Sequence, residues 1–368
     1  MLLSFSQRPV CLHFLNSQRH FNYITTGAAR GVTGHTGGPY DTVPEVVILE
    51  SLFNHSHKYV PIHFDEAGEL LSAGCDDVLL SLYLSIGHRV ATQYLLSALH
   101  GDIPAEHLLH YREAHSQLPG HPELGLTPGV KFSSGRLGHM WPLVNGVALA
   151  NRDKIVFCLG SDGSQQEGND AEAARLAVAQ NLNVKLLIDD NDVTIAGHPS
   201  QYEKGYDVGK TLSGHGLTIF EANGENIDNL WKNIAASIRH DGPTAGELFF
   251  DDNSYLNLMH SIVVVKRKMC PGIEGLEGSS HGHDVISVDT AIKYLTSRGY
   301  PSAVHAFLKE IKPTSLSYIH KGSTKDKGAN RVQFGEAVSN VLDKIGKEEA
   351  AKKVIVIDSM LYKHRATG

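Results

Sequence analysis

The sequence lacks the features by which several large classes of protein are recognised. Its four cysteines, Cys11, Cys75, Cys158 and Cys270, are scattered without paired spacing, which excludes a disulfide framework and a cysteine-based zinc site. No apolar run approaches the roughly 20 residues that span a bilayer. No run of basic residues is present, and the net charge of -7 argues against a nucleic-acid surface. A protein that acts on neither membranes nor nucleic acid is therefore expected.

The composition is that of a globular protein. With 368 residues, of which 41% are hydrophobic and 20% charged, the chain can bury one large core or two smaller ones. Residues 1–40 contain neither Asp nor Glu but carry Arg8, Arg19 and Arg30. We set residues 1–24 apart as an N-terminal segment with two interpretations, a mitochondrial transit peptide or a replaced first helix. The second, with a cytoplasmic protein, is favoured.

A βαβ unit stands out in the middle of the chain. The apolar pattern predicts a strand over residues 154–159, a turn over 160–163, a helix over about 169–181 and a strand over 184–188. Asp162 leaves the first strand and Asn191 follows the second, so their oxygens can converge beyond the carboxyl ends of the strands. A carboxylate, an amide oxygen and the Val193 carbonyl suit Mg²⁺. Taken alone, Asp162 is equally consistent with a solvated turn residue.

The remaining periodicity extends this unit into a larger fold. We predict an α/β domain with a doubly wound, mostly parallel sheet that has helices on both faces. Further strands are expected over residues 217–221 and 261–266. Helices are expected over residues 46–53, 92–99, 104–110, 140–150, 227–238, 285–298 and 302–311.

The Asp-Gly at Asp162 and the Asp-Asp-Asn that ends at Asn191 together resemble the thiamine-diphosphate motif of the transketolase family. The resemblance implies that Asp162, Asn191 and the Val193 carbonyl hold Mg²⁺, with Ca²⁺ as the alternative. It also implies that Gly163 lets the diphosphate approach and that Ile195 contacts the cofactor. One departure is that the first glycine of the family motif is replaced by serine, at position 161.

A series of glycine-histidine pairs recurs in the family's order. They occur at Gly34-His35, Gly87-His88, Gly120-His121 and His281-Gly282. The resemblance implies that His35, His88, His121 and His281 surround the thiazolium ring and the substrate channel, with His88 also contacting the cofactor. Histidine suits this work because its ordinary pKa of about 6.5 allows proton exchange near neutrality. His281 is preferred to His283 because the His-Gly order matches. Singly, any of the 22 histidines is more often a surface residue.

Two further regions carry family features. The resemblance implies that Gly135 and Leu137 contact the aminopyrimidine ring, although Arg136 and His139 depart from the family's loop. It implies too that Glu167 and Glu172 lie at the interface between subunits. Acidic residues also favour the first turn of a helix, and for Glu172 this alternative has equal weight.

The domain organisation follows from the same resemblance. A cofactor-binding domain is expected over residues 25–312, with a segment at 244–260 that interrupts the family pattern and is either a surface excursion or a translated intron. Residues 313–330 are polar and rich in Lys, Ser and Gly, as linkers are. Residues 331–368 resemble the start of the pyrimidine-binding domain, with a helix over 332–345 and a strand over 354–358.

The function implied is the thiamine-diphosphate- and Mg²⁺-dependent transfer of a two-carbon ketol unit from a ketose phosphate to an aldose phosphate. In the family the pyrimidine-binding domain, normally from the opposite subunit, carries the glutamate that activates the cofactor, and no candidate for it is found in this sequence. The chain is therefore expected to be inactive alone, and to need a homodimer or a partner chain. The alternatives are a non-catalytic binding or dimerisation module, and another thiamine-dependent lyase or dehydrogenase.

Overall fold

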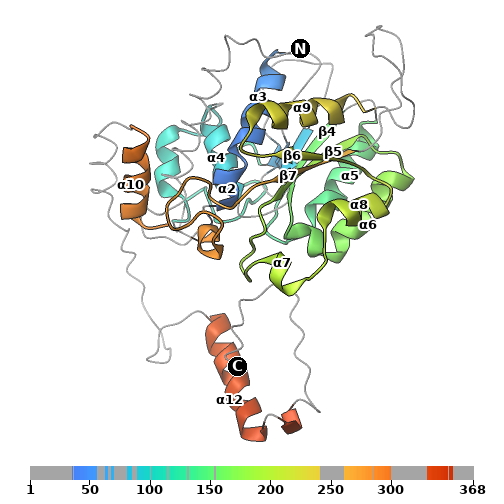
Figure 1. Ribbon diagram of the computed structural model, residues 1–368. Coiled ribbons are helices and arrows are strands. Elements are labelled where there is room, and N and C mark those ends of the chain that lie inside the picture. Colours follow the sequence, from blue (N-terminus) through green and yellow to red (C-terminus); the bar gives the residue numbers. More distant parts are fainter. Residues whose placement is uncertain are drawn as a thin grey trace. The chain divides into compact units, whose positions relative to one another are not determined.

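The computed structural model divides the chain into two units, Met1–Pro313 and Thr314–Gly368, which are described separately (Figure 1). The residues described are 35, 37–55, 63–64, 68–69, 81–84, 89–99, 101–113, 116–130, 132–152, 155–240, 261–284, 286–299, 330–346 and 348–350. Several predicted features lie outside them: residues 1–24, His88, the segment 244–260, the helix 302–311, the linker up to residue 329 and the strand 354–358.

A five-stranded sheet forms the centre of the first unit, and all of its neighbouring strands are parallel. The strand order is β3 (Ser81–Leu84), β4 (Val156–Ser161), β5 (Val184–Asp190), β7 (Ser261–Lys266) and β6 (Thr218–Asn223). The three central strands are rich in Val, Ile and Leu and are buried nearly throughout, as strands covered on both faces must be. A separate antiparallel pair joins β1 (His63–Phe64) to β2 (Gly68–Glu69).

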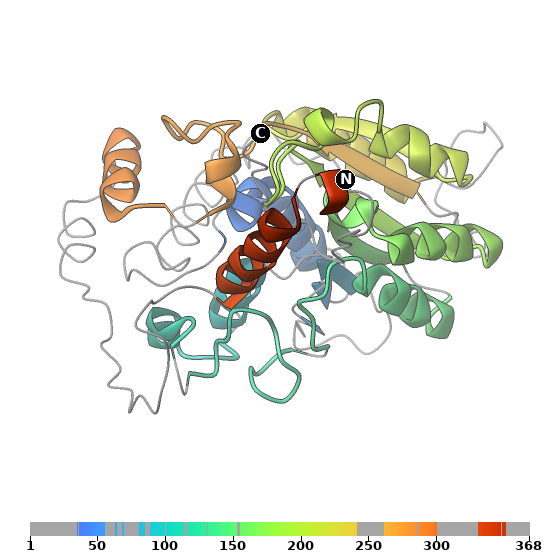
Figure 2. The ribbon, with the colours of Figure 1, turned by 90° about the horizontal axis from the view of Figure 1, so that it is seen from below.

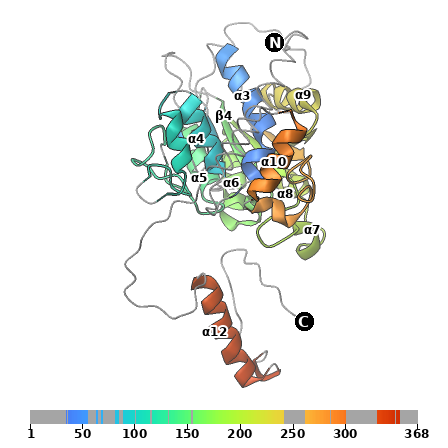
Figure 3. The same ribbon diagram turned by 90° about the vertical axis from the view of Figure 1, so that its left-hand side faces the viewer.

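Helices cover both faces of the sheet, which confirms the predicted doubly wound α/β fold. One face packs against α3 (Val43–His55), α4 (Val90–Leu99) and α9 (Ile227–Ile238). The other face packs against α5 (Met140–Ala150), α6 (Gly168–Ala179) and α8 (Val208–Gly214). Figures 1 and 3 show α3 and α9 side by side.

Local sequence signals explain where the helices begin and end. Helix α9 has the predicted bounds because Asn226 caps it, with its side chain accepting from the N–H of Asn229. Helix α10 (Val288–Ser297) begins later than the predicted residue 285 because Ser287 is its cap and accepts from the N–H of Thr290. Helix α6 ends before the predicted residue 181 because Asn181 adopts a left-handed φ of 48°.

Shorter helices line the loops around the carboxyl ends of the strands. They are α2 (Gly37–Asp41), η3 (Ala105–His110), η4 (Ser164–Gln166), α7 (Pro199–Tyr202) and η5 (Ser280–His283). Helix α2 packs against α10, where the Tyr40 hydroxyl lies 2.8 Å from that of Tyr294. Figures 1 and 2 show α10, in orange, at the end of the unit remote from α5 and α6.

In the second unit the described structure is mainly one helix, α12 (Asn330–Ile345), which matches the predicted helix over 332–345. It is largely exposed along residues 335–345, where Val341 has 56% of its surface accessible. Among the helices described in either unit, none is long and apolar enough to cross a membrane.

Candidate functional site

The turn that follows β4 holds Asp162 in a fixed position. Its Oδ1 accepts the N–H of Gly163 at 2.7 Å, and its Oδ2 accepts the N–H of Asp192 at 2.9 Å. The side chain is buried, and burial raises its pKa well above the ordinary value, with the carboxylates of Asp190 and Asp189 adding to the effect. A buried carboxyl surrounded by other carboxylates is a place where a cation would be strongly stabilised.

The loop that follows β5 brings the second predicted oxygen donor to the same place. Asp192, which donates to Asp162, lies between Asn191 and Val193 in the chain, so the two loops are joined by a hydrogen bond. Asn191 donates through Nδ2 and accepts the N–H of Val193 on Oδ1 at 3.0 Å. Asp192 has a left-handed φ of 57°, which turns the loop sharply after Asn191.

The turn itself is compact and accommodates the serine that departs from the family motif. The Oγ of Ser161 accepts the N–H of Ser164 at 3.1 Å, so this side chain caps the short helix η4. A Cβ added to Gly163 would lie 3.3 Å from Cγ2 of Thr194, which leaves little room for a side chain there. Ile195 lies on the same loop and is 41% exposed.

Behind these donors lies a layer of buried charges that sequence reasoning missed. The Arg89 guanidinium lies 3.2 Å from Oδ2 of Asp189 and donates to the carbonyl of Gly160 at 2.9 Å. Arg267 pairs with Glu45, and its Nε lies 3.2 Å from Oδ1 of Asp189. Burial raises the pKa of Glu45 to about 7, although Arg267 opposes this. The only sequence signal was the position of both arginines next to apolar elements.

Three histidines gather at a second part of the site. The ring of His35 lies 4.8 Å from that of His283, in an edge-to-face arrangement. Burial lowers the pKa of His35 to about 3, helped by the positive charges of His283, Arg112 and His121. Burial also lowers the pKa of His121. Histidines in this environment are held neutral near pH 7.

The two histidines of the loop before α10 differ in environment. His281 is exposed, whereas His283 is buried against His35. The preference for His281 was based on residue order, and the turn of η5 instead directs the second histidine inward. His88 lies outside the described residues.

The loop before α5 links the histidines to Glu167. Gly135 has a φ of 126°, and an added Cβ would lie 2.9 Å from the Cδ2 atom of His121. An added Cβ on Gly138 would collide with the side chain of Glu167, whose pKa is raised by burial. Leu137, between the two glycines, is half-buried. Glu172 is exposed on α6 and joins neither group.

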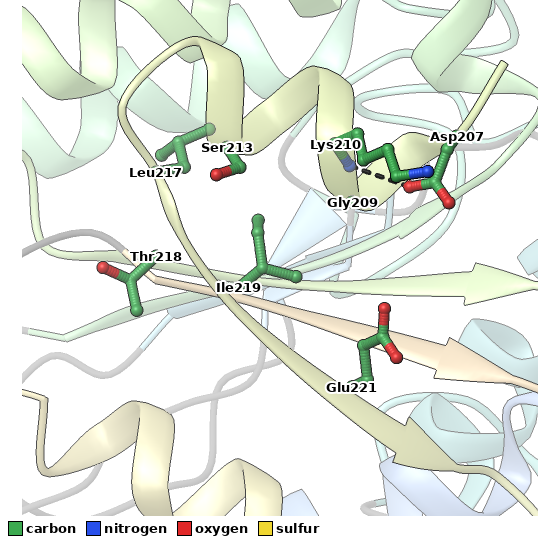
Figure 4. A pocket seen from close by; sticks show the side chains of 8 residues that line it. All are labelled: Asp207, Gly209, Lys210, Ser213, Leu217, Thr218, Ile219 and Glu221. Carbon is green, nitrogen blue, oxygen red and sulfur yellow. Dashed lines mark hydrogen bonds between the residues drawn. The ribbon is translucent and has the colours of Figure 1, made fainter.

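A hollow of about 660 Å³ lies apart from these residues, between α8 and β6. Figure 4 shows Asp207, which accepts the N–H of Lys210, at one end of the hollow and Thr218 at the other. None of the predicted site residues lines it. Within the described part of the chain, no three His, Cys, Asp or Glu side chains are grouped to hold a metal. The expected donor set has only one such side chain, Asp162.

Known proteins show which family has this arrangement. Residues 80–245 match the family model described as "Transketolase, thiamine diphosphate binding domain". A transketolase from Halalkalibacterium halodurans is 30% identical over 233 residues, covering 59% of this chain and 33% of that protein. One of the subunits of an apulose-4-phosphate transketolase from Actinobacillus succinogenes is 30% identical over 200 residues, covering 53% of this chain and 67% of that protein.

Solved structures have the same fold. The transketolase from Campylobacter jejuni matches with a TM-score of 0.62 and 21% identity, covering 95% of this chain and 51% of that one. The transketolase from Leishmania mexicana matches with a TM-score of 0.62 and 18% identity, covering 93% and 47%. The chain thus spans about half the length of these structures, and its match spans about a third of the Halalkalibacterium protein.

Proposed function

The chain belongs to the transketolase family, and from this premise we propose that it binds thiamine diphosphate through Mg²⁺ held by Asp162, Asn191 and the Val193 carbonyl. Ca²⁺ is the alternative cation. The observation that carries the proposal is the hydrogen bond from Asp192 to Asp162 at 2.9 Å, which joins the two loops that carry these donors. The chain would supply the diphosphate-binding part of an enzyme that transfers a two-carbon ketol unit between sugar phosphates.

The donor chemistry fits the cation. Asp162 provides a carboxylate that is buried beside two other carboxylates, so its charge is stabilised best by a nearby positive ion. Asn191 and Val193 add neutral oxygens, and diphosphate and water oxygens would complete the six positions that Mg²⁺ prefers. The close contact of Gly163 with Thr194 supports a backbone approach by the diphosphate, and Ile195 would contact the cofactor from the same loop.

When bound, thiamine diphosphate supplies the nucleophilic carbon for ketol transfer. We assign the handling of sugar hydroxyls and their protons to the histidine group. His35 and His121 are suited to this because burial keeps them neutral and able to accept protons or hydrogen bonds. His283 joins them through its contact with His35. His88 and His281 keep the roles that the family resemblance implies.

The pyrimidine end of the cofactor would rest on the loop of Gly135 and Leu137. This loop contacts His121 on one side and Glu167 on the other. Glu167 and Glu172 are proposed to face a second protomer, as the resemblance implies. That protomer would be a copy of the chain or a separate polypeptide carrying the pyrimidine-binding domain; the Actinobacillus relative, which is named as one of several subunits, supports the second arrangement. The cytoplasmic location stays a prediction.

Calorimetric titration with thiamine diphosphate and Mg²⁺ tests the binding. The wild-type chain should bind the cofactor only when the metal is present. Asp162→Asn should weaken this binding at least about tenfold, because a carboxylate ligand is lost. Asp170→Asn is the matched control, since it removes another buried carboxylate that contacts Gln165 rather than the two loops. Equal binding by all three proteins would refute the assignment.

Turnover separates the family function from its alternatives. We propose that the chain alone shows no ketol transfer from xylulose 5-phosphate to ribose 5-phosphate. Activity that appears on adding a pyrimidine-domain polypeptide supports an enzyme completed by a partner. Metal-dependent cofactor binding with no activity under any pairing would favour a binding module. A steady rate from the chain by itself would contradict the proposal.

A further inference from the structure

The amide of Asn191 can offer an oxygen to a cation in only one of its two orientations. In the structure its Nδ2 donates to Oδ2 of Asp41 at 3.1 Å and to Oδ2 of Asp189 at 3.1 Å. Ionised carboxylates accept hydrogen bonds but donate none. A reversed amide would therefore place its oxygen against two carboxylate oxygens. The observed orientation leaves Oδ1 on the side of the Val193 N–H, away from both acids.

We propose that Asp41 is a positioning residue that fixes this orientation and so acts on the bound cation through the amide of Asn191. The proposal rests on the proposed function, because the cation is the one that Asn191 would share with Asp162. Positioning of a metal ligand by the group that it hydrogen-bonds is common in metal sites, and its loss typically costs 10- to 100-fold in metal affinity.

Asp41 is itself held at both oxygens. Its Oδ1 accepts the N–H of Cys270 at 2.8 Å, while its Oδ2 accepts from Asn191. The side chain is completely buried at the end of α2, a helix distant in sequence from the loop after β5. Because one oxygen is tied to the backbone after β7, the carboxylate cannot rotate to follow a turning amide. It therefore imposes an orientation on Asn191.

The buried arginines explain how carboxylates persist in this layer. Arg267 is fully buried, donates to the backbone carbonyl of Asp41 and pairs with Glu45. Arg89 and Arg267 both lie within 3.2 Å of oxygens of Asp189. The two guanidinium groups offset the negative charge of the acids behind Asn191. The acceptors that orient the amide are thus part of one packed, charge-compensated unit.

A double-mutant cycle tests the proposal with Mn²⁺ as the probe. The free ion is followed by electron paramagnetic resonance at a saturating concentration of thiamine diphosphate. In Asp41→Asn the new side chain can still accept from Cys270 but turns an NH₂ group toward Asn191, which favours the reversed amide. In Asn191→Asp both end atoms are oxygens, so no orientation is unfavourable. The same Asp41→Asn change is then made in the Asn191→Asp background.

The expected result is a loss of Mn²⁺ affinity of about tenfold or more on Asp41→Asn in the wild-type background. In the Asn191→Asp background the same change should cost less than about threefold, because no amide remains to be turned. Asp170→Asn serves as control and should bind Mn²⁺ like the wild type, since it removes a buried carboxylate that contacts Gln165. Circular dichroism confirms that each variant is folded.

Equal losses in both backgrounds would overturn the inference, because they would mean that Asp41 acts through its charge or through the fold. No loss in either background would overturn it as well. Absence of saturable Mn²⁺ binding by the wild-type chain would instead overturn the proposed function, and this inference with it. If Asp41→Asn does not fold, Asp41→Ala must show the same dependence on residue 191, since it releases the amide without adding a donor.

Discussion

Replacement of Gly138 by alanine tests whether the loop before α5 is built against Glu167. Gly138 has a left-handed φ of 74°, and an added Cβ would lie 2.9 Å from Cγ of Glu167 and closer still to its Cβ. The Glu167 Cβ cannot move away without its backbone. Overpacking of this kind costs about 1–3 kcal/mol. The left-handed conformation costs an alanine about 1–2 kcal/mol in addition.

Gly125 provides the matched control for the backbone contribution. Its φ of 83° is similar, and an added Cβ would meet nothing within 4 Å. Urea unfolding should show a loss of about 1–2 kcal/mol for Gly125→Ala and of about 2–5 kcal/mol for Gly138→Ala, with unchanged m-values. Equal losses for the two variants would refute the contact between this loop and Glu167.

Three further predictions concern buried polar groups. Burial raises the pKa of Asp170 to about 7, so the folded state keeps a proton that the unfolded chain releases near pH 4, and stability should fall as pH rises between these values. Asp170→Asn should remove this dependence and raise the unfolding free energy at pH 8 by up to about 4 kcal/mol; a wild-type pH slope in the variant contradicts this. Burial lowers the pKa of His35 to about 3, so its ring resonances in nuclear magnetic resonance spectra should not titrate between pH 5 and 8, and a midpoint above 6 would be inconsistent. Ser161→Ala should cost about 1–2 kcal/mol in urea unfolding, since the Ser164 N–H loses its acceptor; an unchanged free energy would rule out that cap.

Much of the fold could be predicted because the local signals and the tertiary structure agree. Helix α9 repeats Leu230 and Ile234 on one face, and both side chains are completely buried. The apolar run of β7 gave the observed bounds without adjustment. Strand β4 was predicted two residues short at its carboxyl end, because Gly160 and Ser161 pair with β5 although neither is typical of a strand.

The convergence of Asp162 with the loop of Asn191 could also be expected from the sequence. Both follow parallel strands, and the carboxyl ends of such strands meet at one edge of the sheet. The contacts of Asp41 could not be expected in the same way. It belongs to a short helix that is separated from Asn191 by 150 residues, and no periodic pattern links the two. Only the folded chain shows that they are hydrogen-bonded.

Charge pairing and the choice between neighbouring histidines were beyond sequence reasoning for the same reason. Arg89 and Arg267 are far apart in the chain and share Asp189 as a partner. Isolated charges next to apolar segments are usually solvated, so the sequence alone favoured no burial for them. His281 and His283 differ by one turn of backbone, and the packing around His35 determines which is buried.

Anomalous diffraction from crystals of the chain grown with Mn²⁺ and thiamine diphosphate tests the central claim most directly. A single strong peak should lie about 2.0–2.2 Å from an oxygen of Asp162, Oδ1 of Asn191 and the carbonyl oxygen of Val193. A diphosphate oxygen should complete the same coordination sphere. A peak at any other group of side chains, or cofactor bound without metal at these two loops, would contradict the account.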